Sequence, residues 1–326
     1  SAISHRGSTF DGGSQSLPKA HWVGRLLMEN DEEVSHDILQ MLMCGGDMAH
    51  TTMLSYTKGT NADAVKVNKI IYSTLGKSGE EKVILLKTNK YYKYDDNQID
   101  EIMKNLACEN PRENYLITSE DMTGKAGVWA HWGSWDFTKK YVYDNYQTKT
   151  VEQIAVDIDE NSTLIQKYVD ELNNLDKTAL SQDIKRDNLI NQWFAPYPSY
   201  IPIQNRYEYP CQNQNTTLVC QNGISIDMMS GVVSSSFSAD VKFANLVYPN
   251  QDGNISVVRQ SENGDIDVIL IPGSTGFNVM LAQYPLGNSL YTKLFYLNGY
   301  GTTKFEKFDE QQSVTGIKFS IWKVNW

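Results

Sequence analysis

An acid, a base and an aromatic ring follow one another at four-residue intervals within YLITSEDMTGKAGVW, residues 115–129. If a helix has begun by Asp121, then Asp121 and Lys125 share one helical face, and Trp129 lies on that face one turn further along. A carboxylate, an ammonium group and a ring beside a strand end could hold a small polar ligand. The same spacing also fits a surface ion pair worth about 0.3–0.5 kcal/mol, so spacing alone leaves both interpretations open.

The local sequence predicts how these side chains are positioned. The β-branched and aromatic run from Tyr115 to Ile117 is typical of a short buried strand. The Thr-Ser-Glu-Asp sequence that follows, residues 118–121, offers side-chain oxygens that cap the start of a helix. We expect this helix to be entered at Gly124, and the second glycine at Gly127 predicts a kinked or flexible helix start. The candidate site would therefore follow directly on the end of a strand.

Other catalytic patterns are incomplete in this chain. Residues 123–125 (TGK) lack both the first glycine and the final Ser or Thr of a phosphate-binding P-loop. Ser4, His5 and His21 offer hydroxyl and imidazole groups, but no G-x-S-x-G elbow surrounds them, so little favours a soluble hydrolase. Neither Cys-x-x-Cys nor His-x-x-x-His occurs. A structural zinc site is therefore not predicted, and little favours catalysis by a nucleophile–base pair.

Composition bounds the class of protein. The chain has 326 residues, with 29 Lys and Arg against 39 Asp and Glu, for a net charge of -10. This length suffices for two domains, and the acidic balance argues against a nucleic-acid partner and against docking on an anionic membrane surface. No apolar run of about 18 residues occurs, so no transmembrane helix is predicted, and the polar start predicts no signal peptide. The first residue is not methionine, which fits either a processed product or a soluble piece of a longer protein.

The four cysteines fall into two groups. Cys44 and Cys108 lie in apolar helical surroundings and are expected to pack as small hydrophobic side chains. Cys211 and Cys220 flank QNQNTTLV, which is typical of a hairpin. A disulfide between Cys211 and Cys220 is predicted if the compartment is oxidising.

Three Asn-x-Ser/Thr sequons occur, at Asn161, Asn215 and Asn254. Chance can produce such sequons in a chain rich in Asn, Ser and Thr. In an extracytoplasmic protein they would be acceptors for glycans. They favour a location outside the cytoplasm without establishing it.

The first part of the chain is predicted to be mostly helical. Apolar residues at helical spacing, with caps and glycine stops, predict helices at Trp22–Cys44 with a new start at Asn30, at Ala62–Tyr72, Glu80–Tyr92 and Asp95–Ala107, and in residues 151–158, 164–172 and 183–194. The aromatic run in Lys139–Gln147 is typical of a strand. Four prolines within residues 196–210 then mark a boundary that no helix crosses.

Beyond this boundary, short strand-like runs alternate with Gly, Asn and Asp turns. They are Gly223–Met228, Asp240–Val247, Ile255–Arg259, Ile266–Ile271, Phe277–Gln283, Leu290–Leu297 and Ile317–Val324. This succession is typical of an antiparallel sheet or a small barrel. We therefore predict an α+β fold, with a helical central core over residues 1–205 that includes a few strands and a β-rich, barrel-like peripheral module over residues 206–326.

Three blocks of sequence carry a resemblance to a known family. In chain order they are FDGGSQSLPKAHWVGRLL (10–27), YLITSEDMTGKAGVWAHWGSWDF (115–137), and SLYTKLFYLNGYGTTKFE (289–306) with FSIWKVNW (319–326). Together they resemble the C-terminal globular domain of the archaeal oligosaccharyltransferase catalytic subunit, dolichyl-phosphooligosaccharide–protein glycotransferase. The resemblance spans nearly the whole chain, and the first two blocks are the more specific.

The resemblance implies a function and a location. Enzymes of this family are membrane glycosyltransferases with many transmembrane helices. They move an oligosaccharide from a lipid-linked donor to the Asn of an Asn-x-Ser/Thr sequon in an acceptor polypeptide. The C-terminal domain stands on the extracytoplasmic side of the cell membrane and helps to recognise the Ser or Thr. The implied partners are the acceptor polypeptide and, through the N-terminal transmembrane region, the membrane and the lipid-linked oligosaccharide; no nucleic acid is implied.

The resemblance also implies site residues. In the family, a Trp-Trp-Asp-x-Gly motif and an Asp-x-x-Lys-x-x-x-Met/Ile motif on a kinked helix recognise the acceptor. Asp121 and Lys125 match the acid and base of the second motif with one extra residue between them, and Trp129 stands in for the terminal hydrophobic residue. The first motif is expected upstream of Ser1. The segment WGSWDF, residues 132–137, echoes that motif superficially and is interpreted as a packing segment.

The resemblance further implies that Mn²⁺ or Mg²⁺ is held by carboxylates of the membrane part, so this fragment is expected to bind no cofactor and to be inactive alone. The alternative is a non-enzymatic cell-surface or carbohydrate-binding module, whose aromatic β segments could stack on sugars. The sequence upstream of residue 1 separates these interpretations. Hydrophobic spans ending in a Trp-Trp-Asp-x-Gly block favour the transferase, and an ordinary signal peptide favours the module.

Overall fold

The computed structural model describes residues 17–182, 185–236, 241–274 and 276–326. Its contacts divide the chain into two compact units. The helical unit comprises residues 17–26, Glu33–Arg112 and His131–Pro196, and the β-rich unit comprises Leu27–Glu32, Glu113–Ala130 and Tyr197–Trp326. The predicted α+β fold with a β-rich module is confirmed. The division of the chain near residue 205 stays a prediction.

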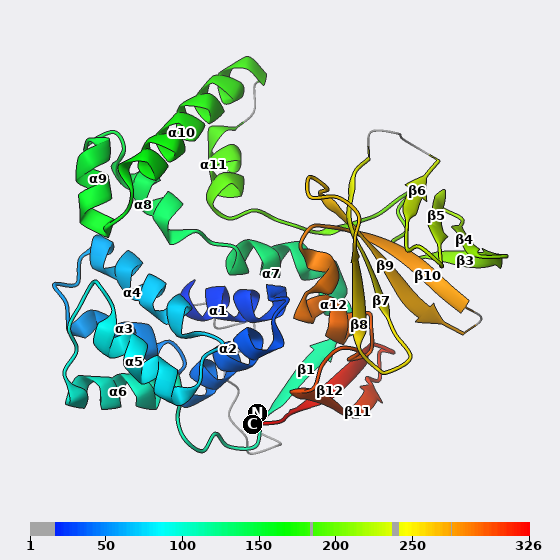
Figure 1. Ribbon diagram of the computed structural model, residues 1–326, viewed down its shortest axis with the longest axis horizontal. Coiled ribbons are helices and arrows are strands. Elements are labelled where there is room, and N and C mark those ends of the chain that lie inside the picture. The colour runs from blue at the N-terminus through cyan, green and yellow to red at the C-terminus, as the bar shows by residue number, and fades with distance from the viewer. Residues whose placement is uncertain (1–16, 183–184, 237–240, 275) are drawn as a thin grey trace. The chain divides into compact units, whose positions relative to one another are not determined.

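Short helices dominate the first two-thirds of the chain (Figure 1). The α-helices are α1 (Leu17–Met28), α2 (Glu32–Gly45), α3 (Met48–Ser55), α4 (Asn61–Thr74), α5 (Gly79–Thr88), α6 (Asp96–Leu106), α7 (Ala126–Gly133), α8 (Phe137–Asn145), α9 (Val151–Ile158), α10 (Ser162–Gln182), α11 (Arg186–Phe194) and α12 (Leu290–Phe295). Short 3-10 helices are η1 (Glu120–Lys125) and η2 (Leu286–Asn288). Across the described residues, none of the helices combines the length and the apolar character that crossing a membrane requires.

Capping boxes define where four of these helices begin. At each start, the N-cap side chain accepts the backbone N–H of the third helical residue, whose own side chain accepts the N-cap N–H. The N-cap residues of α4, α5, α6 and α9 are Thr60, Ser78, Asp95 and Thr150. Because these signals are local in sequence, the predicted helices at Ala62–Tyr72 and Asp95–Ala107 are confirmed to within two residues.

Apolar residues at helical spacing form the core of the helical unit around α8, α9 and α10. The fully buried members include Val142, Ile154, Ile158, Ile165 and Leu172. Ile154 and Ile158 lie one turn apart on α9, and Ile165 and Leu172 lie two turns apart on α10. Burial of such side chains contributes roughly 1.5–3 kcal/mol each. This cluster therefore packs the short helices α8 and α9, which would not be stable alone, against the longer α10.

The strand predicted at Lys139–Gln147 is wrong, because this segment forms α8. Asp136 caps the helix by accepting the backbone N–H of Lys139 at 2.9 Å. Tyr141 and Val142 then turn into the core of the unit. The aromatic residues that suggested a strand are therefore buried by helix packing, and this tertiary burial overrides their intrinsic preference.

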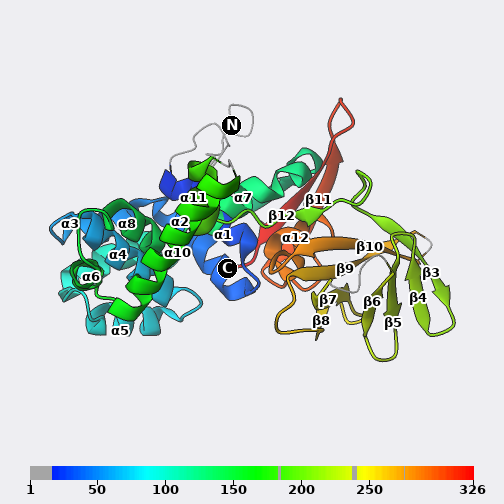
Figure 2. The ribbon, with the colours of Figure 1, turned by 90° about the horizontal axis from the view of Figure 1, so that it is seen from above.

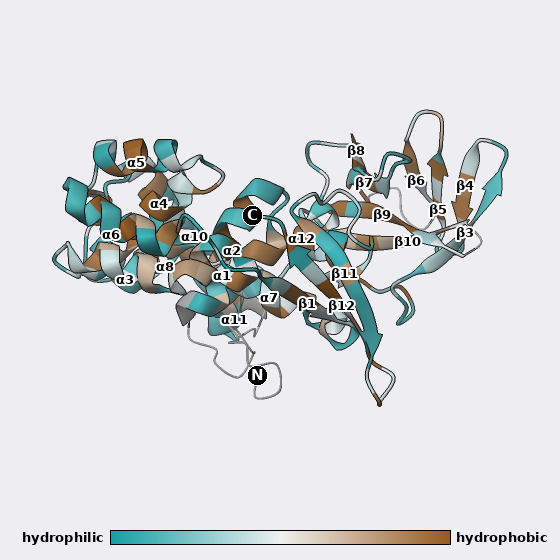
Figure 3. Cartoon of the chain, turned by 90° about the horizontal axis from the view of Figure 1, so that it is seen from below, coloured by the Kyte–Doolittle hydropathy of each residue, from teal (hydrophilic) through white to brown (hydrophobic). Residues whose placement is uncertain are grey.

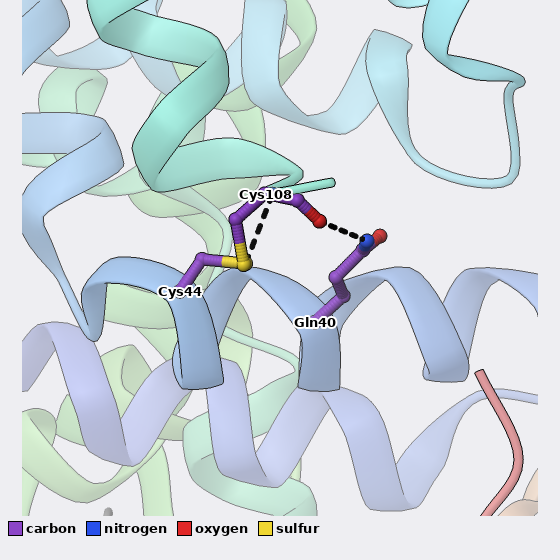
Figure 4. Close-up of a disulfide and its surroundings, with 3 residues drawn as sticks. All are labelled: Gln40, Cys44 and Cys108. Atoms are coloured by element: carbon purple, nitrogen blue, oxygen red, sulfur yellow. Dashed lines mark hydrogen bonds between the residues drawn. A yellow bond between two sulfur atoms is a disulfide. The ribbon is translucent and has the colours of Figure 1, made fainter. Parts of the chain in front are cut away.

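The prediction that Cys44 and Cys108 pack as separate hydrophobic side chains is also wrong. They form a disulfide between the end of α2 and the residues after α6 (Figure 4). Their Cα atoms are 5.6 Å apart. The Gln40 side chain donates to the Cys108 carbonyl at 3.1 Å, and the Cys108 N–H donates to Cys44 Sγ at 3.0 Å. The partners are 64 residues apart in sequence, so no local pattern pairs them.

The β-rich unit contains two sheets. Its strands are β1 (Tyr115–Ser119), β2 (Tyr200–Ile201), β3 (Tyr209–Gln214), β4 (Thr217–Cys220), β5 (Ile224–Asp227), β6 (Val233–Ser235), β7 (Phe243–Pro249), β8 (Ile255–Arg259), β9 (Ile266–Gly273), β10 (Gly276–Gln283), β11 (Phe305–Gln312) and β12 (Lys318–Val324). Among the described residues, the larger sheet runs β6-β5-β4-β3-β10-β9-β7-β8, with β2 paired to β10, and the smaller runs β1-β12-β11.

One strand pair departs from the antiparallel pattern that the sequence predicts. β7 and β9 are parallel, whereas the other strand pairings described in the two sheets are antiparallel. The chain turns back from β7 into β8 along one flank of β7, and β9 then occupies the other flank in the same direction as β7. The turn residues in the sequence show only where the chain reverses. They do not show whether β9 pairs antiparallel with β8 or parallel with β7.

The central strands of the larger sheet supply the core of the β-rich unit. Leu246 on β7, Val268 and Leu270 on β9, and Val279 on β10 are almost completely buried. In Figure 3, β9 and β10 are largely brown, the hydrophobic colour, whereas β11 is teal. The apolar runs predicted at Ile266–Ile271 and Phe277–Gln283 are therefore confirmed as strands.

The strand predicted at Leu290–Leu297 is wrong, because this segment forms α12. The Ser289 hydroxyl accepts the backbone N–H of Thr292 at 3.2 Å and caps the helix. Tyr291 and Leu294 are both buried. A run of large apolar residues satisfies either a strand or a buried helix, and residues 290–294 are all buried. The Ser289 cap is the local feature that favours the helix.

Candidate functional site

The candidate site begins on β1, an edge of the three-stranded sheet. β1 pairs in antiparallel register with β12, with Thr118 opposite Ser320. The Trp322 indole N–H donates to the Thr118 hydroxyl at 2.9 Å, and both residues are buried. In Figure 2, β11 and β12 form a hairpin that projects from the rest of the β-rich unit. The predicted strand at Tyr115–Ile117 is confirmed, and the pairing with β12 continues it to Ser119. Its predicted burial is wrong, because Ile117 on this edge strand is 58% exposed.

The segment after β1 is the 3-10 helix η1, which leads directly into α7. Two contacts fix η1 to other parts of the β-rich unit, and a third lies within η1 itself. The Tyr291 hydroxyl donates to the Met122 carbonyl at 2.6 Å, and the Lys318 N–H donates to a Glu120 carboxylate oxygen at 3.3 Å. The Thr123 hydroxyl donates back to the Glu120 carbonyl at 2.7 Å. Anchors from α12 and β12 therefore hold the turn that carries the candidate residues.

Asp121 and Lys125 are brought together on the surface of η1. Lys125 Nζ lies 3.5 Å from Asp121 Oδ2, and the Ser119 hydroxyl donates to Asp121 Oδ1. The bond from Ser119 is the main cause that lowers the pKa of Asp121, and the charge of Lys125 adds to it. The Asp121 and Lys125 side chains are 49% and 57% exposed, so the pair adds little stability but is accessible to a ligand.

Trp129 does not join this pair. It is only 8% exposed, whereas its neighbour Val128 is 45% exposed. A 3-10 helix turns about 120° per residue, so the rotation between residues four apart differs from that in an α-helix. Because the chain passes from η1 to α7 after Lys125, Trp129 does not continue the row begun by Asp121. Val128 is the exposed apolar residue that follows Lys125 at helical spacing.

Comparisons with known proteins bear on this site. No protein-family model matches the chain. Over 341 aligned residues, covering 98% of this chain, it is 27% identical to the dolichyl-phosphooligosaccharide-protein glycotransferase of Methanococcus voltae. The predicted resemblance to the archaeal oligosaccharyltransferases is confirmed. The chain spans 33% of the length of that glycotransferase.

A second archaeal glycotransferase of the same name, from Methanocaldococcus jannaschii, is 34% identical over 130 residues, which are 40% of this chain and 14% of that protein. Among solved structures, the chain is similar to the crystal structure of the C. jejuni PglB C-terminal domain. That similarity has 12% identity and a TM-score of 0.40, over 98% of this chain and 86% of the other.

The three sequon asparagines of this oligosaccharyltransferase-like chain are all exposed. Asn161 precedes α10 and accepts the Thr163 N–H at 2.8 Å. Asn215 lies in the turn between β3 and β4 with a positive φ of 60°. Asn254 lies in the turn before β8 and donates its backbone N–H to Asn250. Their side chains are open to solvent, and their role as glycan acceptors stays a prediction.

Cys211 and Cys220 are joined by a disulfide across the β3–β4 hairpin. They lie directly opposite each other in the strand register, with Cα atoms 3.9 Å apart. Both disulfides lie away from the Asp121–Lys125 pair in sequence. They bear on the environment of the protein rather than on the chemistry of the site.

His21, one of the residues considered for hydrolase chemistry, is buried inside the helical unit. His21 is 5% exposed; its Nδ1–H donates to the Trp132 carbonyl at 2.7 Å, and Nε2 accepts the Tyr72 hydroxyl at 2.5 Å. Burial lowers the pKa of His21 to about 4. Ser4 and His5 lie outside the described residues. His21 therefore serves as a hydrogen-bond bridge inside the helical unit and offers no surface base.

A metal site also finds no support among the residues that the structure describes. In those ranges, no three His, Cys, Asp or Glu side chains are grouped so that they could hold a metal ion. We therefore assign no step of a reaction to Mn²⁺ or Mg²⁺ in the described part of the chain.

Proposed function

We propose that this chain is the extracytoplasmic C-terminal domain of a membrane oligosaccharyltransferase, which transfers a lipid-linked oligosaccharide to the Asn of Asn-x-Ser/Thr sequons. The observation that carries the proposal is the 27% identity along 98% of the chain to an archaeal glycotransferase three times as long. An isolated binding module of unrelated ancestry would not align from end to end with such a protein.

Within that enzyme, we assign the Asp121–Lys125 pair to recognition of the acceptor Ser or Thr. A hydroxyl needs an acceptor and a donor, and the carboxylate of Asp121 and the ammonium of Lys125 offer both at 3.5 Å from each other. The bond from Ser119 orients one carboxylate oxygen and leaves the other facing Lys125. Exposed Val128 is suited to contact a Thr methyl group. Trp129 acts in this proposal by packing beneath the helix rather than by contact with the acceptor.

The rigid setting of the pair supports this assignment. Positioning an acceptor amide for attack can lower a barrier by several kcal/mol when the binding groups do not move. The bonds from Tyr291 to Met122 and from Lys318 to Glu120 tie η1 to the rest of its unit. A surface ion pair with no further role would not need such anchoring on both flanks.

An extracytoplasmic location accords with the cysteines and sequons. All four cysteines are in disulfides, so none of them is a free thiol. Disulfides persist in oxidising compartments and are rare in reducing ones. The exposed sequons at Asn161, Asn215 and Asn254 would also be accessible there.

We further propose that the reacting carboxylates and their Mn²⁺ or Mg²⁺ belong to parts of the enzyme outside this chain. The described residues hold no carboxylate cluster suited to such an ion. The isolated chain is therefore expected to transfer no glycan when given lipid-linked oligosaccharide, sequon peptide and metal. Transfer by the isolated chain above a no-protein blank would contradict this division of labour.

Replacing Asp121 with asparagine in the full-length enzyme is expected to lower kcat/KM for a sequon peptide about tenfold, since hydrogen bonds to charged groups contribute about 1.5–3 kcal/mol. The loss should appear mainly in KM, because the pair binds the acceptor and does not react. Lys125→Met should have a similar effect. The measurement is peptide glycosylation at several peptide concentrations.

A matched control uses the exposed Lys140–Asp144 pair on α8, which has the same four-residue separation. Asp144→Asn should leave peptide glycosylation unchanged. Wild-type kinetics in both Asp121→Asn and Lys125→Met would contradict the role of this pair in acceptor recognition. Activity of the full-length enzyme would still support the proposal that it is an oligosaccharyltransferase.

A further inference from the structure

A pocket of about 310 Å³ lies within the helical unit. One wall is the segment that connects α7 and α8, which the sequence analysis interpreted as a packing segment. The side chains used in the argument below are Asn68, Lys69, Tyr72, Trp135, Asp136 and Phe137. This volume matches the small end of ordinary ligand sites.

The floor of the pocket is one face of α4. Val65, Asn68, Lys69 and Tyr72 line it, and their spacing of three, four and seven residues places them on a single helical stripe. Such a stripe normally faces a core and is apolar. Here three of its four residues carry polar groups, so α4 presents a polar surface to a pocket that is open to solvent.

Asn68 is the least explained of these residues. It is only 6% exposed, and within the described parts of the chain its carboxamide has no hydrogen-bond partner. Its amide atoms are not cut off from solvent, so water in the pocket satisfies them. A ligand that pairs with both ends of the carboxamide would replace this water.

Charged groups of both signs line the pocket: Arg25 and Lys69 are cationic, and Asp136 is anionic. Lys69 Nζ is already engaged by the Glu160 carboxylate and lies 3.4 Å from the Ile158 carbonyl. Asp136 places a carboxylate at the opposite wall. Its Oδ1 accepts the Lys139 N–H at 2.9 Å, whereas no described residue donates to Oδ2. The pocket therefore offers Asn68 and Asp136 to a ligand with neutral hydroxyl groups.

Aromatic rings complete the pocket. Trp135 packs edge-on against Phe194 at 4.7 Å, and Phe137 packs edge-on against His21 at 4.9 Å. These contacts hold the rings in place while both still line the pocket. Aromatic side chains bury apolar surface at little loss of conformational freedom, and the C–H faces of a pyranose ring present such a surface beside hydroxyl groups.

We propose that this pocket binds one pyranose unit of an oligosaccharide. The Asn68 carboxamide donates to and accepts from ring hydroxyls, the free oxygen of Asp136 accepts another hydroxyl, and Trp135 and Phe137 contact the C–H face. The site is separate from the Asp121–Lys125 pair, and it requires only that the protein meets sugar chains.

The test titrates the 326-residue chain with methyl α-D-glucopyranoside, methyl α-D-mannopyranoside and the methyl glycoside of N-acetylglucosamine. Tryptophan indole resonances are followed by NMR. Saturable shifts are expected with at least one glycoside, and Asn68→Leu should weaken that binding about tenfold or more. Because the Asn68 carboxamide makes no hydrogen bond to the described residues, the melting temperature of Asn68→Leu should stay equal or rise.

The matched control is Asn174→Leu, the same substitution at an exposed position of α10, which should leave binding unchanged. Absence of saturable binding by all three glycosides, or equal binding by wild type and Asn68→Leu, overturns the proposal. Binding of inorganic phosphate to the same resonances without any glycoside binding overturns it in favour of an anion site. If Asn68→Leu fails to fold, Asn68→Ala is measured in its place, with the same expected loss of binding.

Discussion

Replacing Cys44 and Cys108 together with alanine is expected to lower the free energy of unfolding of the helical unit by about 4 kcal/mol, from the loop-closure entropy of a cross-link of this span. The disulfide joins positions 64 residues apart and encloses α3 to α6 within its loop. Without it, the unfolded chain gains many conformations while the folded contacts change little. Denaturant unfolding, followed by far-UV circular dichroism, measures the loss.

The surroundings of this bond (Figure 4) require a close approach of α2 and α6. A Cβ at Gly45 would come within 2.6 Å of the Asn105 side chain. The Gln40 amide also reaches the Cys108 carbonyl at 3.1 Å. These contacts remain in the alanine variant, so the fold should persist and only its stability should fall.

The second disulfide gives the comparison. Cys211 and Cys220 are only nine residues apart, and the same entropy argument gives about 3 kcal/mol for their removal. The two bonds lie in different units, so each pair is replaced in a separate variant. A loss on removing Cys44 and Cys108 that is no larger than the loss at the hairpin would contradict the loop-length argument.

Lowering the pH from 6.5 to about 4 is expected to weaken the helical unit by about 3 kcal/mol through His21 alone, since each tenfold change in proton affinity corresponds to about 1.4 kcal/mol. Burial is the main cause that lowers the pKa of His21 to about 4, and the charge of Arg25 lowers it further. The hydrogen bond to the Trp132 carbonyl acts in the opposite direction.

The direction follows from proton linkage. Between pH 6.5 and about 4, the unfolded chain carries a protonated His21 while the folded chain does not, so protons favour the unfolded state. The contribution of the neutral imidazole is fully present above 6.5 and is lost as the pH falls through this window. In the folded unit, Nε2 accepts the Tyr72 hydroxyl, and protonation would remove that acceptor.

Unfolding free energies at pH 7, 6, 5 and 4 test this expectation. His21→Phe should be less stable than wild type at pH 7 but should show a flatter pH dependence over the window. His50→Gln is the control, because His50 is also partly buried with a lowered pKa yet lacks the two internal bonds of His21. A pH profile of His21→Phe as steep as that of wild type would assign the loss to other groups.

Local signals in the sequence account for the parts of the fold that were predicted. Capping residues and helical spacing place α4 and α6, and alternating or continuous apolar runs place β9 and β10. The failures at Lys139–Gln147 and Leu290–Leu297 share a cause. Both are rich in aromatic and large apolar residues, which suit a strand and a buried helix equally, so packing partners elsewhere in the chain decide.

At the candidate site, too, local sequence patterns predict some features and contacts with distant parts of the chain decide others. Four-residue spacing is enough to predict that Asp121 and Lys125 can meet, and the strand before them is readable from its apolar residues. Two features depend on the tertiary structure: Trp129 is buried, and residues 120–125 form a 3-10 helix held by Tyr291 and Lys318 from distant parts of the chain. Such anchors have no local signature.

By itself, the sequence determined the α+β class, most helix starts, the acid–base pair and the family to which the chain is similar, because these rest on short-range patterns and on the order of sequence blocks. Only the tertiary structure decided the Cys44–Cys108 bond, the burial of His21 and the pocket that surrounds Asn68. Each of these brings together residues from separate helices. Such contacts depend on how helices pack, and the spacing of residues along one helix does not specify its partners.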